Sequence, residues 1–167
     1  MTEWVHLQLL RLYRRLPRRA RRGVVRRVAP TFTVGATCLI ERADGRVLLI
    51  RQSYRNHWGL PGGLLQRREH PAAAARREIR EEVGLDITLV SEPAVVIDAV
   101  PRRIDIVYRA RPTRDSDADT ARPTSVEIVE AGWFSPTELP DVQRETSQAL
   151  QALARASLSP PARPLPA

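Results

Sequence analysis

The sequence predicts an α/β fold, and more specifically an α/β/α sandwich built around a mixed β-sheet. The first observation is the order of patterns along the chain: strand-like runs, a helix, further strand-like runs and a closing helix. The second is size, because 167 residues with 43% hydrophobic content suffice for one domain with a proper core. No internal repeat is evident. We therefore expect one domain over residues 31–156, preceded by a separate extension and followed by a Pro-rich, disordered tail over residues 157–167.

The positive charge of the chain lies almost entirely in the extension, residues 1–30. The formal net charge is +8, and nine of the 27 basic residues but only one of the 19 acidic residues fall in that segment. The rest of the chain therefore contains 18 basic and 18 acidic residues. The charge balance therefore does not indicate that the domain itself binds nucleic acid.

The extension has the pattern of two short, basic amphipathic helices. Leu9, Leu12 and Leu16 recur at helical spacing, and Pro17 interrupts the run. Three roles stay open: packing on the domain or on a second subunit of a homodimer, contact with an anionic membrane surface, or contact with nucleic acid. No secretory or membrane-spanning segment is evident, and the lone Cys38 excludes an intrachain disulfide. We expect a cytoplasmic protein, with peripheral membrane association as an alternative.

The domain begins with a predicted antiparallel pair of strands. Residues 31–40 are rich in β-branched side chains, Asp44-Gly45 is a strong turn signal, and residues 47–50 form an apolar run. Cys38 lies in the first run and is expected in the core. A polar and aromatic loop follows over residues 53–58.

A helix is predicted over residues 71–83. Pro71 suits the first helical turn, four alanines favour the interior, and Gly84 fits a left-handed C-terminal cap. At about 100° per residue, three carboxylates fall within one arc of the helix surface: Glu78, Glu81 and Glu82.

This acidic face is unusual for a solvated helix surface. Glu78 and Glu82 are like charges four residues apart, and the cluster lies in the last two turns, where the helix dipole disfavours anions. A bound divalent cation would compensate, and clustered carboxylate oxygens suit Mg²⁺ or Mn²⁺. We therefore predict a metal platform on this helix.

Strands return after Gly84. Strand-like runs cover residues 87–90, 94–100, 103–110 and 126–134, and a closing helix is expected over residues 142–156. Residues 111–125 form an acidic loop that we expect to be flexible. Its three alternating aspartates resemble a calcium loop, but Thr120 replaces the glycine that such a loop needs.

The residues around the helix resemble the Nudix box at every specified position. Gly63 is followed after five residues by Glu69, and after seven more by the run from Arg77 to Leu85, REIREEVGL. The preceding residues 58–62, WGLPG, are also similar to the approach to that box. Gln66 and Arg68 depart from the Glu and Gly that the family often has there. Both lie outside the acidic face.

The resemblance implies a Nudix-like fold and a metal-dependent hydrolase. Glu78, Glu81 and Glu82 would hold Mg²⁺ or Mn²⁺ with the backbone carbonyl of Gly62, and Arg77 would orient Glu78. The general base would be Glu78 or a carboxylate outside the helix. Glu127 is similar in placement to a further metal ligand of some members, with Glu130 as the competing candidate. The loop before the box offers three substrate-binding candidates: Tyr54, Arg55 and Trp58.

The implied reaction is hydrolysis of a nucleoside diphosphate linked to another moiety. ADP-ribose-like compounds, nucleotide sugars and nucleoside triphosphates all stay open as substrates. One alternative is a non-catalytic Nudix-like module that binds a nucleotide, although a degenerate box would be its simplest sign. Another is an enzyme tethered to membrane or RNA by residues 1–30.

Overall fold

The computed structural model describes residues 31–158, together with positions 7, 14, 17 and 20. The chain divides into two units, residues 1–32 and 33–167, and the following concerns the second unit. Our predictions for the helices of the extension and for residues 159–167 lie outside the described residues. Among the helices of the described part, none is long and apolar enough to cross a membrane.

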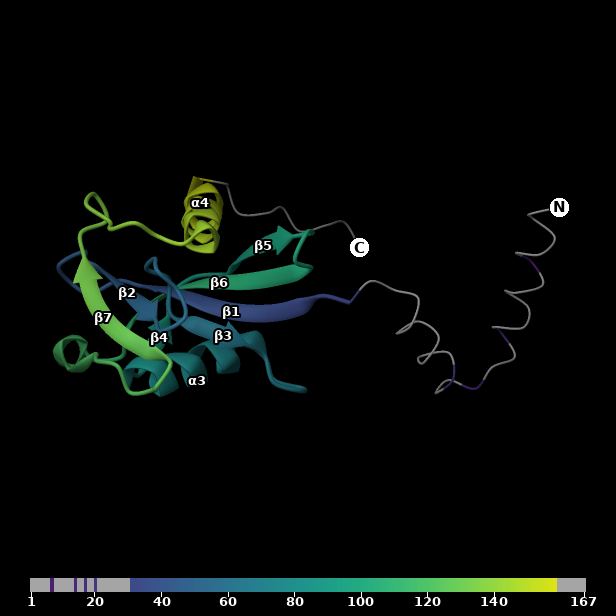
Figure 1. The fold of residues 1–167 in the computed structure, drawn as a ribbon, viewed down its shortest axis with the longest axis horizontal. Helices are drawn as coiled ribbons and strands as arrows, with labels where there is room; N and C mark the ends of the chain where they lie inside the picture. Colours follow the sequence, from purple (N-terminus) through teal and green to yellow (C-terminus); the bar gives the residue numbers. More distant parts are fainter. Residues whose placement is uncertain (1–6, 8–13, 15–16, 18–19, 21–30, 159–167) are drawn as a thin grey trace. The chain divides into compact units, whose positions relative to one another are not determined.

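The domain contains a five-stranded mixed sheet between two helices, α3 and α4 (Figure 1). β1 and β6 are parallel at the centre of this sheet, and all other neighbours are antiparallel. β3 flanks β1, while β4 and β5 pair with successive parts of β6. The strands are β1 (Thr33–Ile40), β3 (Gly62–Leu64), β4 (Ile87–Leu89), β5 (Ala94–Asp98) and β6 (Arg103–Pro112). The predicted α/β class and mixed sheet are confirmed.

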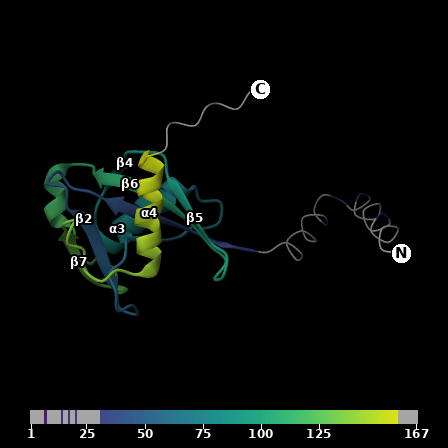
Figure 2. The ribbon, with the colours of Figure 1, turned by 90° about the horizontal axis from the view of Figure 1, so that it is seen from above.

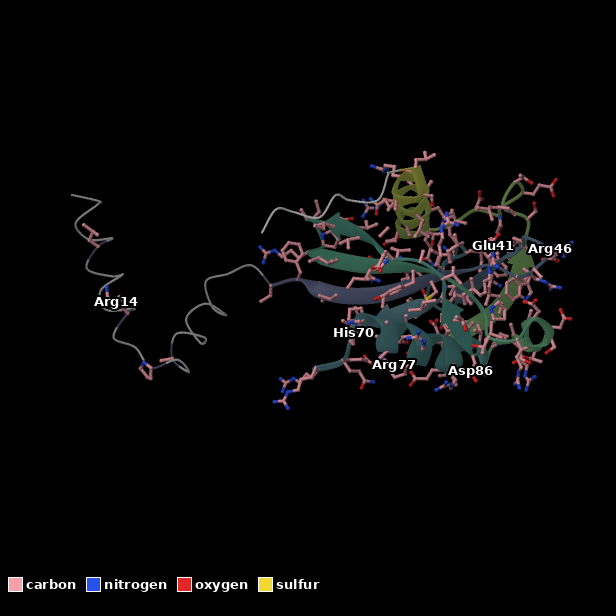
Figure 3. All side chains as sticks on the ribbon, turned by 180° about the vertical axis from the view of Figure 1, so that it is seen from behind. Arg14, Glu41, Arg46, His70, Arg77 and Asp86 are labelled. Carbon is pink, nitrogen blue, oxygen red and sulfur yellow. The ribbon has the colours of Figure 1, made fainter. Side chains whose placement is uncertain are left out.

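The helix α3 (Pro71–Val83) begins and ends as its sequence predicts. Pro71 occupies the first turn, and Gly84 takes the left-handed conformation at the C-terminal cap, with φ of 69°. The sequence did not indicate the N-cap, His70, whose Nδ1 accepts a hydrogen bond from the backbone N–H of Ala72 at 3.3 Å. Figure 3 shows His70 before the helix, Arg77 along it and Asp86 beyond its end.

The two faces of β1 pack against different helices. Even-numbered residues such as Ala36 and Cys38 join the core beneath α3, with Ile79 and Val83. Leu39 instead joins the core beneath α4 (Arg144–Leu158), which lies over β5 and β6 (Figure 2). Because side chains alternate along a strand, the other odd-numbered residues of β1 also lie on the α4 side.

The predicted hairpin between the first two strands forms only at its turn. Glu41 and Val47 make a single antiparallel bridge, after which the chain leaves the sheet. β2 (Val47–Gln52) pairs instead with β7 (Ile128–Phe134) in a separate two-stranded sheet. The two edges of β1 pair instead with β6, along its whole length, and with β3, over Gly35 to Thr37.

Three smaller features also differ from the expectations. β3, inside the box, was not predicted as a strand. The acidic loop contains a 3₁₀ helix, η1 (Asp115–Thr120), which is anchored because the indole N–H of Trp133 donates to the Ala118 carbonyl at 3.0 Å. α4 includes Ser157 and Leu158, which we had assigned to the tail; the Ser157 hydroxyl donates to the Leu153 carbonyl within the helix.

Candidate active site

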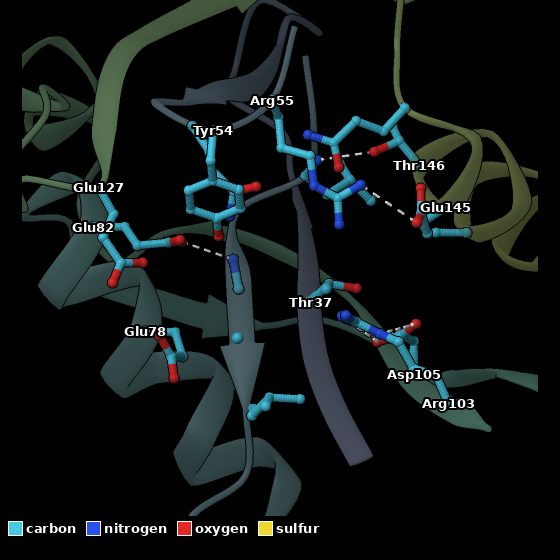
Figure 4. Close-up of a pocket in the computed structure, with 17 residues that line it drawn as sticks. Thr37, Tyr54, Arg55, Glu78, Glu82, Arg103, Asp105, Glu127, Glu145 and Thr146 are labelled. Carbon is cyan, nitrogen blue, oxygen red and sulfur yellow. Dashed lines mark hydrogen bonds and ion pairs between the residues drawn. The ribbon is translucent and has the colours of Figure 1, made fainter. Parts of the chain in front are cut away.

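A cavity of about 470 Å³ opens beside the short edge strand β3. Side chains from α3 line one end, and side chains from β1, β6 and α4 line the other (Figure 4). We call these the acidic end, lined by Glu78, Glu82 and Glu127, and the sheet end, lined by Thr37, Arg103, Asp105, Glu145 and Thr146. The volume lies in the range typical of small-molecule sites.

Glu82 lies at the centre of the acidic end and is buried, with 7% of its surface exposed. Its Oε2 accepts a hydrogen bond from the backbone N–H of Gly62 at 2.7 Å. Gly62 has φ of 142°, and a Cβ there would lie 2.3 Å from the Ala36 carbonyl oxygen. Only glycine therefore allows this close approach of β3 to β1 beneath the carboxylate.

The surroundings of Glu82 disfavour its negative charge. Burial is the main cause, and it raises the pKa of the carboxyl to about 8 although the Gly62 hydrogen bond acts in the opposite direction. Glu78, Glu127 and Glu81 raise the pKa further by charge repulsion. A cation at this end of the cavity would relieve that repulsion.

Glu78 is held from two sides. A Cβ at Gly63 would lie 2.5 Å from the Glu78 carboxylate carbon, so the absence of a side chain there lets the carboxylate pack against β3. On the other side, the Nη1 of Arg77 donates to Glu78 Oε1 at 2.8 Å. The predicted contact between Arg77 and Glu78 is present.

Arg77 also connects the rest of the acidic face. Its Nε and Nη2 donate to the two carboxylate oxygens of Glu69 at 2.8 and 2.9 Å, and Nη1 lies 3.1 Å from Glu81 Oε2. This bidentate pairing lowers the pKa of Glu69 to about 2. Glu69, a box position to which we had given no role, therefore anchors the guanidinium that holds Glu78.

The predicted metal ligands occupy three different settings. Glu78, Glu82 and Gly62 line the cavity, whereas Glu81 does not and keeps a side chain that is 58% exposed. Glu127 lines the cavity beside Glu82 (Figure 4), while its competitor Glu130 is paired with Arg51 across β2 and β7. The geometry thus favours Glu127 over Glu130.

The three substrate-binding candidates also separate. Tyr54 and Arg55 line the cavity, and Arg55 reaches toward Glu145 of α4 with an N–O distance of 3.5 Å. Trp58 is not among the lining residues. Its ring packs edge-on against Phe134, with centroids 4.8 Å apart.

The sequence pattern provides little indication of the sheet end. The strand β6 is predicted from its apolar residues Ile104 and Ile106. Arg103 and Asp105 alternate with them, so their side chains lie on the opposite face of the strand. The one indication of this site is that Arg103 and Asp105 are charged residues on a strand that helices cover on both faces. Thr37 and Thr146 are far apart in the chain, and nothing in the sequence pattern connects them.

The chemistry of the acidic end fits a hydrated divalent cation. Within the described part of the chain, no three acidic, His or Cys side chains form a ready cage for a metal ion. Mg²⁺ commonly takes one or two carboxylates and completes its shell with water and substrate phosphate oxygens. Two carboxylates, Glu78 and Glu82, with Glu127 beside them, match that mode of binding.

Comparisons with known proteins relate this chain to one family. A family model described as the NUDIX domain matches residues 31–155. A MutT-like protein of Streptomyces ambofaciens is 28% identical over 116 residues, covering 70% of this chain and 72% of that protein. A putative 8-oxo-dGTP diphosphatase of Mycobacterium tuberculosis is 33% identical over 119 residues, with 65% and 55% covered.

A third relative is much longer than this chain. The 8-oxo-dGDP phosphatase of Homo sapiens is 33% identical over 115 residues, which span 65% of this chain but only a third of that protein.

Solved structures share the fold. A MutT Nudix hydrolase from Burkholderia pseudomallei is 30% identical, with a TM-score of 0.56 over 74% of this chain and 99% of that one. An ADP-ribose pyrophosphatase from Streptococcus suis is 26% identical, with a TM-score of 0.59 over 77% and 94%. With a complete box from Gly63 to Leu85 and a matching family model over most of its length, this chain belongs to the Nudix hydrolase family and is a pyrophosphohydrolase by class.

Proposed function

We propose that the cavity hydrolyses the diphosphate linkage of a nucleotide with the help of Mg²⁺ or Mn²⁺. The observation that carries this proposal is the meeting of Glu78, Glu82 and Glu127 at one end of a nucleotide-sized cavity. Charge repulsion among these carboxylates is relieved when a cation and a phosphate chain enter together. The intact acidic face argues against a module that only binds nucleotides.

The residues of the acidic end have separable tasks. Glu78, Glu82, Glu127 and the Gly62 carbonyl would hold the cation, with Glu81 at the outer edge. When bound, the cation would neutralise the phosphate charge and lower the pKa of an attacking water. Arg77 fixes Glu78, and Glu78 or a second carboxylate of the cavity accepts the proton of that water.

The metal platform is tested with a matched pair of variants. Glu127→Gln removes a carboxylate that lines the cavity, and Glu130→Gln removes one from the same region that is paired with Arg51. We expect Glu127→Gln to weaken Mg²⁺ binding in titration calorimetry and to reduce turnover, while Glu130→Gln matches the wild type. The reverse result would assign the ligand to Glu130.

The substrate is identified with a panel of Mg²⁺-dependent hydrolysis assays. It includes ADP-ribose and 8-oxo-dGTP, which are named for two of the relatives above, together with dinucleoside polyphosphates and nucleotide sugars. Product analysis distinguishes release of a nucleoside monophosphate from release of inorganic phosphate. Absence of turnover throughout the panel, with Glu82→Gln equal to the wild type, would contradict hydrolysis.

The role of the basic extension and the cytoplasmic location stay predictions. Deleting residues 1–29 separates the three roles of the extension. Loss of flotation with anionic liposomes indicates a membrane contact, and loss of RNA retention indicates a nucleic-acid contact. A change only in melting temperature or in the oligomeric state indicates packing on the domain or on a second subunit.

A further inference from the structure

The C-terminal end of α3 is closed by a segment that lies far along the chain. A helix leaves its last four carbonyl groups without partners inside the helix, and in α3 these belong to residues 80–83. The Arg80 carbonyl accepts a hydrogen bond from the backbone N–H of Gly84 at 3.0 Å. The other three carbonyls accept hydrogen bonds from residues 122–125, which we name the capping segment. Every carbonyl of the last turn therefore has a partner.

Thr124 supplies two of the three hydrogen bonds of the capping segment. Its hydroxyl donates to the Glu81 carbonyl at 2.8 Å, and its backbone N–H donates to the Glu82 carbonyl at 2.9 Å. The backbone N–H of Arg122 donates to the Val83 carbonyl at 3.2 Å. The capping segment is thus attached to the turn of α3 that carries Glu82.

The capping segment leads directly into Glu127. The Ser125 hydroxyl accepts from the backbone N–H of Glu127 at 3.1 Å, and the Ser125 carbonyl accepts from that of Ile128 at 3.2 Å. On the other side, the Glu127 carbonyl accepts from the backbone N–H of Ser53 at 2.8 Å. These bonds fix the backbone of Glu127, while its side chain lines the cavity beside Glu82 (Figure 4).

The attachment opposes a repulsion within the acidic end. Glu82 and Glu127 carry like charges at the same end of the cavity, so each disfavours the charge of the other. Without a cation, this repulsion would drive the capping segment away from α3. Its hydrogen bonds to α3 resist that movement. A carboxylate that is already in place binds a cation more tightly than one that must first be ordered, because ordering costs free energy on binding.

We infer that Thr124 is a positioning residue for the cation, because it attaches the segment that leads to Glu127 to the turn that carries Glu82. A carboxylate from outside α3 is thereby held next to the carboxylates of the helix. Thr124 does not itself line the cavity. Its effect should therefore fall on metal affinity and not on nucleotide binding. This inference deepens the proposed function and rests on it for the role of the cation.

The test removes one hydroxyl and keeps the shape of the side chain. Thr124→Val loses the hydrogen bond to the Glu81 carbonyl but keeps the backbone N–H, and Thr124→Ser keeps both. Binding of Mn²⁺ to the full chain without nucleotide is measured by titration calorimetry. We expect Thr124→Val to weaken it by about tenfold, as for the loss of an outer partner of a metal ligand, and Thr124→Ser to match the wild type. In assays, the Mn²⁺ concentration for half-maximal turnover should rise with little change in the nucleotide KM.

Thr120 provides a matched control. It is an exposed threonine of the same connection, and its hydroxyl donates to the Asp117 carbonyl at 2.7 Å within η1. Thr120→Val removes a hydrogen bond of the same kind at a distance from α3 in the chain. It should bind Mn²⁺ with the affinity of the wild type.

A second background separates positioning from a general effect on the helix. If Thr124 acts through Glu127, Thr124→Val should have no further effect on Mn²⁺ affinity in a protein that already carries Glu127→Gln. If it only stabilises α3, it should disturb Glu78 and Glu82 as well and weaken binding by the same factor in both backgrounds.

Each outcome is decisive for the inference. The same factor in both backgrounds, or wild-type affinity in Thr124→Val, would overturn it and leave the proposed hydrolysis standing wherever the wild type turns over a substrate of the panel. The expected pattern of Mn²⁺ binding in a protein without turnover would sustain the inference and contradict the hydrolysis. A wild type that binds no Mn²⁺ would contradict both.

Discussion

The two ends of the cavity are built in different ways. The acidic end takes Glu78 and Glu82 from adjacent turns of one helix, with their supports Arg77 and Glu69 in the same stretch of chain. The sheet end takes Thr37, Asp105 and Thr146 from β1, β6 and α4. A pair of carboxylates within one helix leaves a pattern that a sequence shows directly, whereas a site assembled from three distant elements becomes visible only when the sheet register is known.

The largest expected effect is at the acidic end. Glu82→Gln should lower kcat by about 10² to 10³, as expected when one group that stabilises the transition state is lost. The measurement is turnover at saturating Mg²⁺ with the best substrate of the panel. Unchanged turnover would mean that the acidic end is not the reaction centre.

The same variant should have the opposite effect on the stability of the metal-free protein. The pKa of Glu82 is raised to about 8 in the folded state and is near 4.5 when unfolded. The protonated folded form therefore contributes stability below pH 4.5 that is lost as the pH rises toward 8. Glu82→Gln should raise the melting temperature at pH 8 and leave it nearly unchanged at pH 4.5. A lower melting temperature at pH 8 would show that the buried charge is not unfavourable.

A smaller loss of activity is expected when Arg77, which supports the acidic end, is replaced. Arg77→Gln breaks the contacts to Glu69, Glu78 and Glu81, and loss of such an outer partner commonly lowers activity by about 10- to 100-fold. Arg80→Gln is the matched control, because Arg80 is on the same helix but pairs with Asp86 on the outside. We expect kcat to fall in the first variant only, with the nucleotide KM little changed. Equal losses would indicate a general effect of helix charge.

At the sheet end, replacing either of two threonines by valine should change the free energy of unfolding, and the two changes should have opposite signs. Thr37→Val removes a hydroxyl without a partner in the described structure and should stabilise the free protein by up to about 1 kcal/mol. Thr146→Val removes the acceptor of the Leu60 backbone N–H, at 3.2 Å, and should destabilise it by about 1–3 kcal/mol. Denaturant unfolding measures both.

The two variants also separate ligand binding from folding. Thr37→Val should weaken binding of the best substrate of the panel by about fivefold, which is about 1 kcal/mol. A destabilised Thr37→Val with unchanged affinity for that substrate would make Thr37 a structural residue.

The smallest effect concerns the other face of β1. Cys38 points into the core beneath α3, and burial raises the pKa of its thiol to about 12. A thiol reagent at pH 8 should therefore react only as fast as the protein unfolds. Since the thiol of the unfolded chain ionises near pH 9, stability should fall between pH 9 and 12, and less so in Cys38→Ala. Rapid reaction in the folded protein would place Cys38 nearer the cavity.

The sequence allowed prediction where local rules determine the structure. Pro71 and Gly84 define the ends of α3, and the spacing of Glu78 and Glu82 gives one face of that helix. The sequence did not allow prediction of which strands pair with each other, because pairing depends on the whole sheet. Asp44-Gly45 correctly indicated a turn but not that β3 and β6 would take both edges of β1. Nor does the sequence indicate that Asp105 lies opposite Gly35 in the sheet.

The alternation along β1 has a consequence for changing this protein by design. Thr37 of β1 and its neighbours Arg103 and Asp105 of β6 line the cavity, whereas the even-numbered positions of β1 pack beneath the helix that carries Glu82. A library that varies residues 37, 103 and 105 therefore explores new substrate preferences while the core beneath the metal platform stays unchanged. Variation at residues 36 and 38 would disrupt the core beneath α3 and so lower activity on every substrate. Substrate range and reaction chemistry are thus encoded on opposite sides of a single strand.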